Sequence, residues 1–591
     1  MSNGVEKRMK MLLCAINAKY IHSNLAVYSL KASAGEYKDQ IEIADFTINN
    51  QVDYILEGIY KKKPDVLCFS CYIWNISLVE TLMKEFHKLC PDVPIWLGGP
   101  EVSFEVETFL KNHPEVTGIM MGEGEETFYE LCKSYVLAKG DYTKAEERWA
   151  LILGIAYRKS GEDAICIQPW RDTMCMSKIP FCYDKMEDFS NRIIYYESSR
   201  GCPFSCSYCL SSVDKKLRFR DIDIVKEELQ FFIDQKVPQV KFVDRTFNCN
   251  HEHAYAVWKY IMENDNGVTN FHFEVSADLL NEEELQLMSQ MRPGLIQLEI
   301  GVQSTNEVTV QEIKRTMKLE RVKEVVRRVK SFGNIHQHLD LIAGLPYEDY
   351  ETFGKSFDEI YALEPNQLQM GFLKVLKGSY MYEHAKEYEL IYHDNPPYEV
   401  LSTKWLSFGD ILKMKRIEEM LEVYYNSGQF EIAMKVLNCC YESAFDMFQR
   451  LGDFYEENGY FGMHHSRIKR CEILLEFIEK EIHASALEGD VYNCIKEALI
   501  FDLYYRENCK SRPSWAADMG AFKSITHFYC KNGKLSHVEP FHYDFLGEGS
   551  KLPEYKENPL WVLYHYEKRD PLTHQAEIEY VVPEKDMVEA E

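Results

Sequence analysis

Short apolar runs alternate with amphipathic segments over the first part of the chain. The apolar runs fall at 9–17, 41–48, 65–74, 93–99 and 117–125. Between them, segments such as 77–90 and 125–138 carry apolar residues at helical spacing. Strands that are apolar throughout and separated by helices are typical of a parallel sheet covered on both faces. We therefore predict a doubly wound α/β domain over residues 1–139, and such domains bind ligands at the carboxyl ends of their strands.

A second alternating series begins at Ile193. Its predicted strands are 193–199, 239–244, 270–276, 294–301, 336–344 and 367–375. Amphipathic segments such as 223–235 and 319–333 lie between them. Repeated βα units of this kind predict a full or partial (β/α) barrel over residues 193–395.

The two remaining parts of the chain carry weaker patterns. Residues 140–192 read as a connector with a hairpin turning at Ser160–Gly161. After about Pro396 the strand signals fade and long helical stretches follow. We predict a mainly helical domain over residues 396–591, with a tail from 535 rich in aromatic, acidic and turn residues.

Charge and hydropathy narrow the function classes. The formal net charge of -27 argues against a chain that wraps nucleic acid, because phosphate binding needs a basic footprint. No run of about 18 apolar residues predicts a membrane span. The N-terminal segment lacks the long apolar core of a signal peptide. We expect a cytoplasmic protein.

Three of the eighteen cysteines are tightly spaced, namely Cys202, Cys206 and Cys209. Three thiolates this close can bind three irons of one [4Fe–4S] cluster and leave the fourth iron with an open coordination site. A zinc site is the alternative, but zinc sites usually close with four ligands in two pairs, and no second pair is present. Pro203 and Phe204 stiffen the loop, and Tyr208 is placed to pack against an adenine.

The cysteines outside this trio read as core residues. Most stand singly on apolar strands or helices, where a free thiol is a small hydrophobic residue. The later ones are too scattered to predict a second cluster, and they are Cys439, Cys440, Cys471, Cys494, Cys509 and Cys530.

A cysteine trio on a loop after the first strand of a βα barrel resembles the radical S-adenosylmethionine (radical SAM) superfamily. The resemblance implies that the open iron binds S-adenosylmethionine and that the cofactor is cleaved to a 5'-deoxyadenosyl radical. It also implies an electron donor such as flavodoxin or ferredoxin. Strand ends matching the family pattern make five residues candidates for contacts to S-adenosylmethionine, with capping or ion pairing as the alternative: Asp244, Arg245, Glu274, Glu299 and Gln303.

The first domain resembles the cobalamin-binding domain that precedes the barrel in cobalamin-dependent radical SAM enzymes. Small residues at the strand ends fit the close approach of a nucleotide tail. The residues that carry the resemblance are Ser70, Gly98, Gly99, Gly122, Glu123 and Gly124. A flavodoxin-like domain without cofactor is the competing interpretation.

One departure from that family concerns the lower face of cobalt. Many cobalamin domains carry Asp-x-His-x-x-Gly after the first strand, and its histidine binds cobalt. Here the loop from Asn17 to His22 does not fit that spacing. We therefore expect cobalamin to bind without a protein histidine ligand, and we expect Tyr20, Tyr72 and Trp74 either to pack against the corrin ring or to fill the core.

The combined resemblance implies an enzyme that modifies an unactivated carbon of a small molecule or peptide, most often by methylation. A porphyrin-type oxidase or cyclase, or another radical enzyme with a degenerate cobalamin domain, is the alternative. A methylthiolating enzyme would need three more cluster cysteines near its N-terminus, and Cys68 and Cys71 lie on a buried strand. A non-catalytic iron–sulfur protein fits the open-site spacing least. The C-terminal region resembles the uncharacterised helical domain behind some of these enzymes.

Overall fold

The computed structural model describes residues 9–139, 141–161, 164–184, 189, 191–484, 487, 490–530, 535–547 and 552–583. The chain divides into two compact units. The first comprises Met1–Glu299, Gln311–Lys318 and Phe372–Lys404, and the second comprises Ile300–Val310, Leu319–Gly371 and Trp405–Glu591. Strand β13 (Ile296–Gln303) runs from the first unit into the second.

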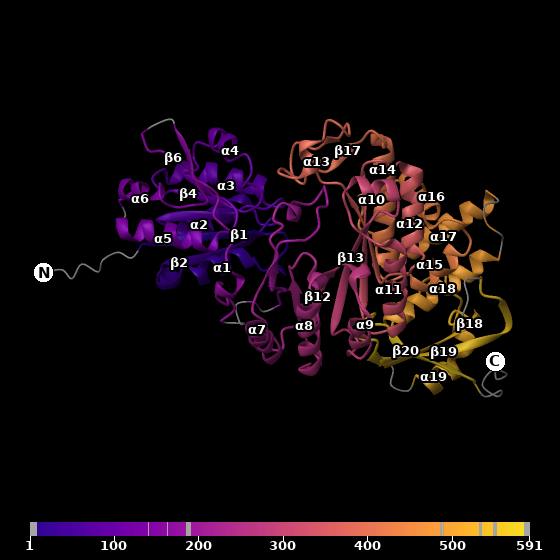
Figure 1. Ribbon diagram of the computed structural model, residues 1–591. Coiled ribbons are helices and arrows are strands. Elements are labelled where there is room, and N and C mark those ends of the chain that lie inside the picture. Colours follow the sequence, from indigo (N-terminus) through magenta and orange to yellow (C-terminus); the bar gives the residue numbers. More distant parts are fainter. Residues whose placement is uncertain are drawn as a thin grey trace. The chain divides into compact units, whose positions relative to one another are not determined.

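The first unit begins with a seven-stranded sheet in the order β2-β1-β3-β4-β5-β6-β7 (Figure 1). Its first five strands pair in parallel. They are β1 (Met11–Asn17), β2 (Ile41–Thr47), β3 (Val66–Ser70), β4 (Ile95–Gly98) and β5 (Gly118–Met120). Every residue of β1, β3 and β5 is buried, as a sheet covered on both faces requires. The predicted doubly wound domain is confirmed.

Helices cover both faces of this sheet. One face packs against α2 (Val52–Lys62), α3 (Ile76–Leu89) and α4 (Val106–Asn112). The other packs against α1 (Leu25–Ser33), α5 (Glu125–Ala138) and α6 (Tyr142–Trp149). Five apolar residues of α3 recur at helical spacing and are buried against the sheet, namely Ile76, Val79, Leu82, Met83 and Phe86.

The connector contributes strands to the same sheet. The predicted hairpin forms from β6 (Ile155–Arg158) and β7 (Ile165–Ile167), which pair antiparallel. Part of its turn, residues 162–163, lies outside the described residues. The pattern did not predict that β6 pairs antiparallel with β5 and so covers the backbone edge of that short strand.

A second parallel sheet follows in the first unit, in the order β8-β11-β12-β13. Its strands are β8 (Ile194–Tyr196), β11 (Gln239–Phe242), β12 (Asn270–Val275) and the start of β13. The helices between them are α7 (Ile222–Asp234), α8 (His251–Glu263) and α9 (Glu282–Ser289). Burial alternates along β13, so one of its faces is apolar and the other carries polar side chains.

Short elements complete the first unit. Strands β9 (Ser199–Arg200) and β10 (Arg218–Phe219) pair antiparallel on either side of the cysteine loop. The segment from 372 to 404 adds α13 (Tyr380–Glu383), β16 (Ile391–Tyr392) and β17 (Val400–Ser402). Its Tyr382 hydroxyl donates to Glu105 (3.1 Å) and its Tyr398 hydroxyl to Glu101 (2.8 Å), so it is hydrogen-bonded to the first domain.

The second unit continues the βα series from β13 in the order β13-β14-β15. Its strands are β14 (His336–Ala343) and β15 (Gln367–Phe372), and its first helices are α11 (Leu319–Phe332) and α12 (Tyr350–Tyr361). Helix α10 (Glu307–Glu312) lies between β13 and α11 in the sequence. All six predicted strands of the second series are therefore present.

The rest of the second unit is mainly helical, as predicted. Its helices are α14 (Phe408–Met420), α15 (Glu431–Asn438), α16 (Ala444–Glu457), α17 (Arg467–His483), α18 (Val491–Arg506) and α19 (Lys523–Tyr529). The tail also forms an antiparallel sheet that was not predicted, from β18 (Ser536–Tyr543), β19 (Tyr555–Arg569) and β20 (Ala576–Val581). Among the described residues, no helix combines the length and apolar character that crossing a membrane requires.

Candidate active site

The three predicted cluster cysteines lie on one loop that follows β8 and β9. Cys202 and Cys206 are buried, and Cys209 is half-buried. The main-chain N–H of Ser207 donates to the carbonyl of Ile313 at 2.9 Å, and the N–H of Cys209 donates to the carbonyl of Cys206 at 3.1 Å. The loop is therefore held in a fixed position at the carboxyl end of the first strand of the second sheet.

A half-buried arginine lies against this loop. Arg315 Nη1 is 3.8 Å from the sulfur of Cys206 and 3.3 Å from the hydroxyl of Tyr208. Burial raises the pKa of the Cys206 thiol, while the Arg315 charge opposes that rise. Burial also raises the pKa of Tyr208 above its usual value, so its hydroxyl stays protonated. Arg315 is far from the cysteines in sequence, and no local signal could have identified it.

The loop fits an iron–sulfur cluster. Three thiols on one loop are the donor set that a cubane needs, and the positive charge beside Cys206 compensates thiolate charge. In a cubane each thiolate binds its own iron, so the three sulfurs need not converge on one point. Over the described part of the chain, no three His, Cys, Asp or Glu side chains gather closely enough to share a single metal ion.

Asp244 lies at the end of β11, where it binds the segment that leads into the loop. Its carboxylate accepts hydrogen bonds from Ser198 N (3.0 Å), Ser198 Oγ (2.7 Å) and Ser199 Oγ (2.5 Å). His253 Nε2 lies 3.0 Å from the Ser198 hydroxyl. The side chain is fully buried, and burial raises its pKa although the serine contacts oppose the rise. The predicted contact to S-adenosylmethionine stays a prediction, and the geometry matches the capping alternative.

Glu299 lies on the polar face of β13, where Lys241 and His272 bind its carboxylate. Its carboxylate is 2.9 Å from Lys241 Nζ and 2.9 Å from His272 Nε2. Burial would raise the pKa of Glu299, but the contacts to His272 and Lys241 outweigh it and hold the pKa well below its usual range. Glu274 is two residues beyond His272 on β12, so it points to the same face, and its charge acts on Lys241.

The other two predicted contacts, Arg245 and Gln303, belong to different units of the chain. Arg245 is exposed, directly after Asp244. Gln303 ends β13 in the second unit with φ +75, and among the described residues its side-chain oxygen is buried without a hydrogen-bond partner. An orphaned buried oxygen at a strand end fits a group that binds a ligand. Its contact to S-adenosylmethionine stays a prediction.

The glycines at the strand ends of the first domain serve different purposes. Gly99 has φ +116, and a Cβ there would lie 2.4 Å from the carbonyl oxygen of Cys71. A Cβ on Gly122 would lie 3.0 Å from Trp170, and one on Gly124 would lie 2.9 Å from Leu30. Gly99 is therefore required by packing against the backbone, and Gly122 is favoured by its φ of +73 and the nearby Trp170 ring, whereas at Gly124 the end of the Leu30 side chain could move aside. At Gly98 a Cβ would meet nothing nearer than 3.5 Å. The absence of a side chain leaves space at that strand end, which fits the close approach of a large ligand.

Ser70 and His22 both have partners inside the protein. The Ser70 hydroxyl accepts a hydrogen bond from Asn24 at 3.0 Å. His22 Nδ1 lies 2.7 Å from the hydroxyl of Tyr195 on β8, in the second sheet. Burial, followed by the charges of Lys19 and Lys241, lowers the pKa of His22 and keeps the ring neutral. Its ring contact joins the two sheets of the first unit.

Tyr20, Tyr72 and Trp74 were predicted either to pack against the corrin ring or to fill the core, and none of them is fully buried. Tyr20 is 62% exposed with Arg192 4.9 Å from its ring centre, and Trp74 is 43% exposed. Tyr72 and Trp74 stack with ring centres 4.4 Å apart and planes 6° from parallel. Part-exposed rings after β1 and β3 fit a flat ligand at the carboxyl edge of the first sheet.

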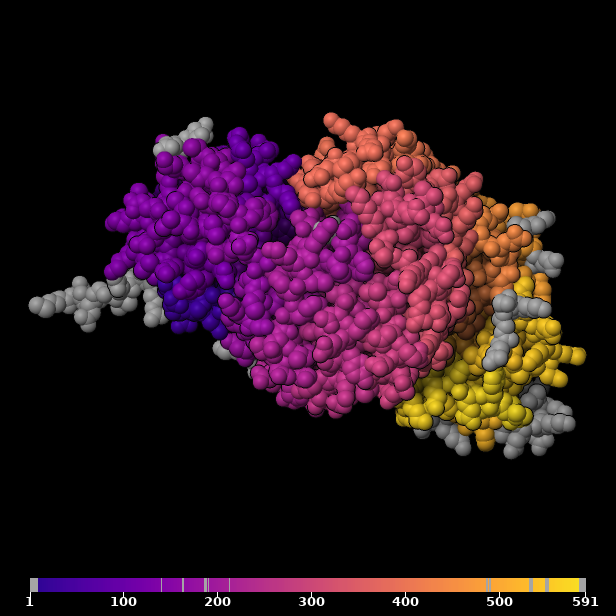
Figure 2. Space-filling view, in the orientation of Figure 1, coloured from indigo at the N-terminus to yellow at the C-terminus, as the bar shows by residue number. Residues whose placement is uncertain are grey.

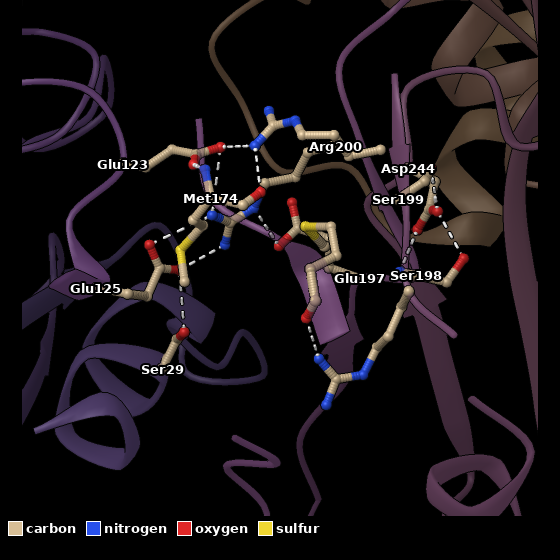
Figure 3. A network of polar contacts seen from close by, with 12 residues as sticks. Ser29, Glu123, Glu125, Met174, Glu197, Ser198, Ser199, Arg200 and Asp244 are labelled. Atoms are coloured by element: carbon tan, nitrogen blue, oxygen red, sulfur yellow. Dashed lines mark hydrogen bonds and ion pairs between the residues drawn. The ribbon is translucent and has the colours of Figure 1, made fainter. Parts of the chain in front are cut away.

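Glu123, predicted to approach cobalamin, lies in a network of ion pairs with the β9–β10 strand pair (Figure 3), and its approach to cobalamin stays a prediction. One of its oxygens accepts from Met174 N at 2.9 Å, and the other accepts from Arg218 Nη1 at 2.5 Å. Two residues on, Glu125 binds Arg200, which directly precedes the cysteine loop. In the space-filling view the indigo-to-purple residues of the first domain meet the magenta residues that follow (Figure 2). Sequence reasoning missed both arginines.

Three family models match the chain. Residues 11–132 match the B12 binding domain and residues 196–360 match the radical SAM superfamily. The chain is a radical SAM protein with a B12-binding domain. Residues 386–563 match a protein family of unknown function, DUF4080. The predicted cofactor set of a [4Fe–4S] cluster, S-adenosylmethionine and cobalamin is confirmed by the first two matches.

Several known proteins resemble this radical SAM chain. An uncharacterised methyltransferase of Pyrococcus horikoshii is 24% identical over 65% of this chain and 82% of its own length. The 2-(S-pantetheinyl)-carbapenam-3-carboxylate methyltransferase of Streptantibioticus cattleyicolor is 28% identical over 49% of this chain, which spans only 44% of that protein. The anaerobic magnesium-protoporphyrin IX monomethyl ester cyclase of Rubrivivax gelatinosus is 22% identical over 55% of this chain and 59% of its own length.

A solved structure shows the same fold. The cobalamin-dependent S-adenosylmethionine radical enzyme OxsB superimposes with a TM-score of 0.54 at 14% identity, over 84% of each chain. That coverage extends beyond the two cofactor-binding domains. The radical SAM and B12-binding assignments are therefore supported by sequence and by architecture.

Proposed function

We propose that this chain is a cobalamin-dependent radical SAM enzyme that methylates an unactivated carbon of a small molecule or peptide. The observation that carries the proposal is the cysteine loop itself. Its thiols lie on one fixed loop with Arg315 beside Cys206, and a B12-binding domain is ion-paired to the residue before it. Methyltransferases among the relatives support methylation as the outcome.

Cys202, Cys206 and Cys209 would hold the cluster. The proposed contacts to S-adenosylmethionine are Tyr208, Asp244, Arg245, Glu274 and Gln303. When bound, the cluster and S-adenosylmethionine supply a 5'-deoxyadenosyl radical that removes hydrogen from carbon, and cobalamin supplies a methyl carrier. The chain's own residues position these groups. Asp244 fixes Ser198 and Ser199, and thereby the direction in which the loop leaves β9.

The electron donor, the cellular compartment and the domain bounds are proposed as well. Reduction of the cluster requires a one-electron donor such as flavodoxin or ferredoxin, and the chain works in the cytoplasm. The high number of cysteines outside the trio supports a reducing compartment. The domain bounds of 1–139, 140–192, 193–395 and 396–591 also stand as proposals.

Anaerobic reconstitution tests the cluster. The wild type should bind about four irons per chain and cleave S-adenosylmethionine when reduced. Cys206→Ala should abolish both, whereas Cys494→Ala, which changes a buried thiol of α18, should retain both. Cleavage retained by Cys206→Ala would overturn the assignment.

A second experiment tests cobalamin. The chain is incubated with hydroxocobalamin, desalted, stripped of its cluster and examined by visible absorption. A corrin spectrum at close to one equivalent is expected, and a colourless protein would refute cobalamin binding.

An oxidase or cyclase is the second candidate, because a cyclase is also among the relatives. The two reactions differ in the fate of the methyl group of S-adenosylmethionine. With methyl-labelled S-adenosylmethionine, a methyltransferase passes the label to its product, whereas a cyclase does not. A non-catalytic iron–sulfur protein would cleave no S-adenosylmethionine at all.

A further inference from the structure

Arg200 is placed between the two cofactor-binding domains. It ends β9, and it is followed in the chain by Gly201 and the proposed cluster ligand Cys202. Its backbone pairs with Arg218 of β10, so the position of Arg200 and the start of the cysteine loop are fixed together. Whatever holds the Arg200 side chain therefore also holds the first residue of the proposed cluster site.

Carboxylates from both domains hold that side chain. Arg200 Nη2 donates to Glu125 Oε1 at 2.5 Å and Nη1 to Glu125 Oε2 at 3.3 Å, a bidentate pair. On its own domain, Arg200 Nε donates to Glu197 at 2.9 Å. Glu123 adds a third carboxylate at 3.6 Å. Figure 3 shows these contacts converging on the one guanidinium.

The pair with Glu125 is shielded from solvent. The Arg200 side chain is 17% exposed and that of Glu125 is 6% exposed. Glu125 is also the first residue of α5, and it accepts a hydrogen bond from Ser29 of α1 at 3.2 Å. A buried, bidentate pair is costly to break, because either partner left alone is an unpaired buried charge. The contact therefore acts as a rigid link rather than a loose surface pair.

The link joins the two places where cofactors bind. Glu125 begins the helix that follows the β5 strand end, on the edge of the first sheet where doubly wound domains bind ligands. Arg200 begins the cysteine loop. A shift of the β5–α5 loop when a ligand binds is thus transmitted to Cys202 through two side chains.

We propose that Arg200 is a positioning residue that couples occupancy of the B12-binding domain to the cluster loop. The inference rests on the proposed function and adds a role that neither cofactor needs for its own binding. Bound cobalamin should hold the β5–α5 loop, and through Glu125 and Arg200 it should make the cluster loop harder to open. By reciprocity, the cluster should also tighten the binding of cobalamin.

Iron release measures this coupling without any substrate. The reconstituted chain, with and without hydroxocobalamin, is mixed anaerobically with a coloured ferrous chelator, and the rate of iron loss is followed. In the wild type cobalamin should slow iron loss at least about fivefold, the lower end of coupling between sites. In Arg200→Gln cobalamin should still bind and the cluster should still form, but the slowing should fall below about twofold.

Arg171 provides a matched control. It is a connector arginine that binds the same helix, through Thr127 at 3.1 Å and the carboxylates of Glu126 and Glu130. These contacts are confined to the first domain and its connector. Arg171→Gln therefore removes the charge of an arginine that is ion-paired with α5. It should leave the effect of cobalamin on iron release unchanged.

A second variant tests the coupling in case Arg200→Gln fails to form the cluster. Glu125→Gln removes the partner from the other domain and leaves Arg200 paired with Glu197, so it should also lose the protection by cobalamin. Equal protection in wild type and Glu125→Gln, or no protection in the wild type, would overturn the coupling. A wild type that binds no cobalamin at all would instead refute the proposed function, and the absorption spectrum distinguishes that result.

Discussion

The glycine before the first cluster cysteine offers a sharp test of the loop's geometry. Gly201 has φ +90, and a Cβ at this position would lie 2.5 Å from the carbonyl oxygen of Lys216. Alanine costs about 1–2 kcal/mol in such a left-handed conformation. The Cβ must also retreat by about 0.9 Å, from 2.5 to the 3.4 Å of ordinary contact, and overpacking of this kind costs about 1–3 kcal/mol. We expect Gly201→Ala to destabilise the loop by about 2–5 kcal/mol.

Gly333 supplies the matched control for this change. It has φ +68, and no atom of the described residues lies within 4 Å of where a Cβ would stand. Gly333→Ala therefore bears the conformational cost without the clash. After anaerobic reconstitution and desalting, Gly201→Ala should hold less iron than the wild type and lose it to a chelator at least about tenfold faster, since about 1.4 kcal/mol is a factor of ten. Gly333→Ala should match the wild type in both respects. If Gly201→Ala kept its iron at the wild-type rate, the loop could not have the conformation described here.

Two further changes test the packing on which the site depends. Arg220 and Glu228 form a buried bidentate pair, and the Arg220 side chain also donates to Met176 O at 2.6 Å. Arg220→Met should lower the free energy of unfolding in urea by about 3–5 kcal/mol, while adding Glu228→Leu should recover most of it; equal losses in both would contradict this account. In the second unit, burial raises the pKa of Asp502 to about 7, although the N–H groups of Ile432 and Ala433 donate to it. The folded state then holds a proton that the unfolded state releases from about pH 4, so this contribution to stability should decline between about pH 4 and 7 and vanish in Asp502→Asn. Parallel stability–pH curves for wild type and variant would refute it.

Local patterns predicted the elements well because local physics determines them. The predicted helix over 125–138 coincides with α5, that over 319–333 is one residue longer than α11, and that over 77–90 is shifted by one residue from α3. Apolar residues at helical spacing and capping side chains act within one or two turns, so the sequence alone carries this information. The three-stranded sheet of the tail was missed because its pairing joins Ser536 to His565, and no short window contains both.

The sequence predicts the proposed cluster ligands but not the residues that surround them. Cys202, Cys206 and Cys209 are close in sequence, so their spacing alone indicates a shared cluster. Arg315 approaches Cys206 across 109 residues, and Arg200 approaches Glu125 across 75. Contacts at such separations depend on how the sheets pack against each other, which no spacing motif records.

The acidic residues after β5 show why location alone does not assign a role. Their position at the carboxyl edge of the first sheet predicts contact with a ligand, and the same edge is where the second sheet packs. An acidic residue at this edge can contact either a ligand or a neighbouring domain. Only the position of a cationic side chain, which the spacing does not give, distinguishes these two roles. Both oxygens of Glu123 are occupied, by Met174 N and Arg218, and Glu125 is neutralised by Arg200. These pairs remove negative charge from the start of α5, which would otherwise repel the phosphate of a nucleotide tail from the helix N-terminus. The ion pairs join the two domains, and a nucleotide tail bound at this strand-end edge, as proposed, would meet less negative charge there.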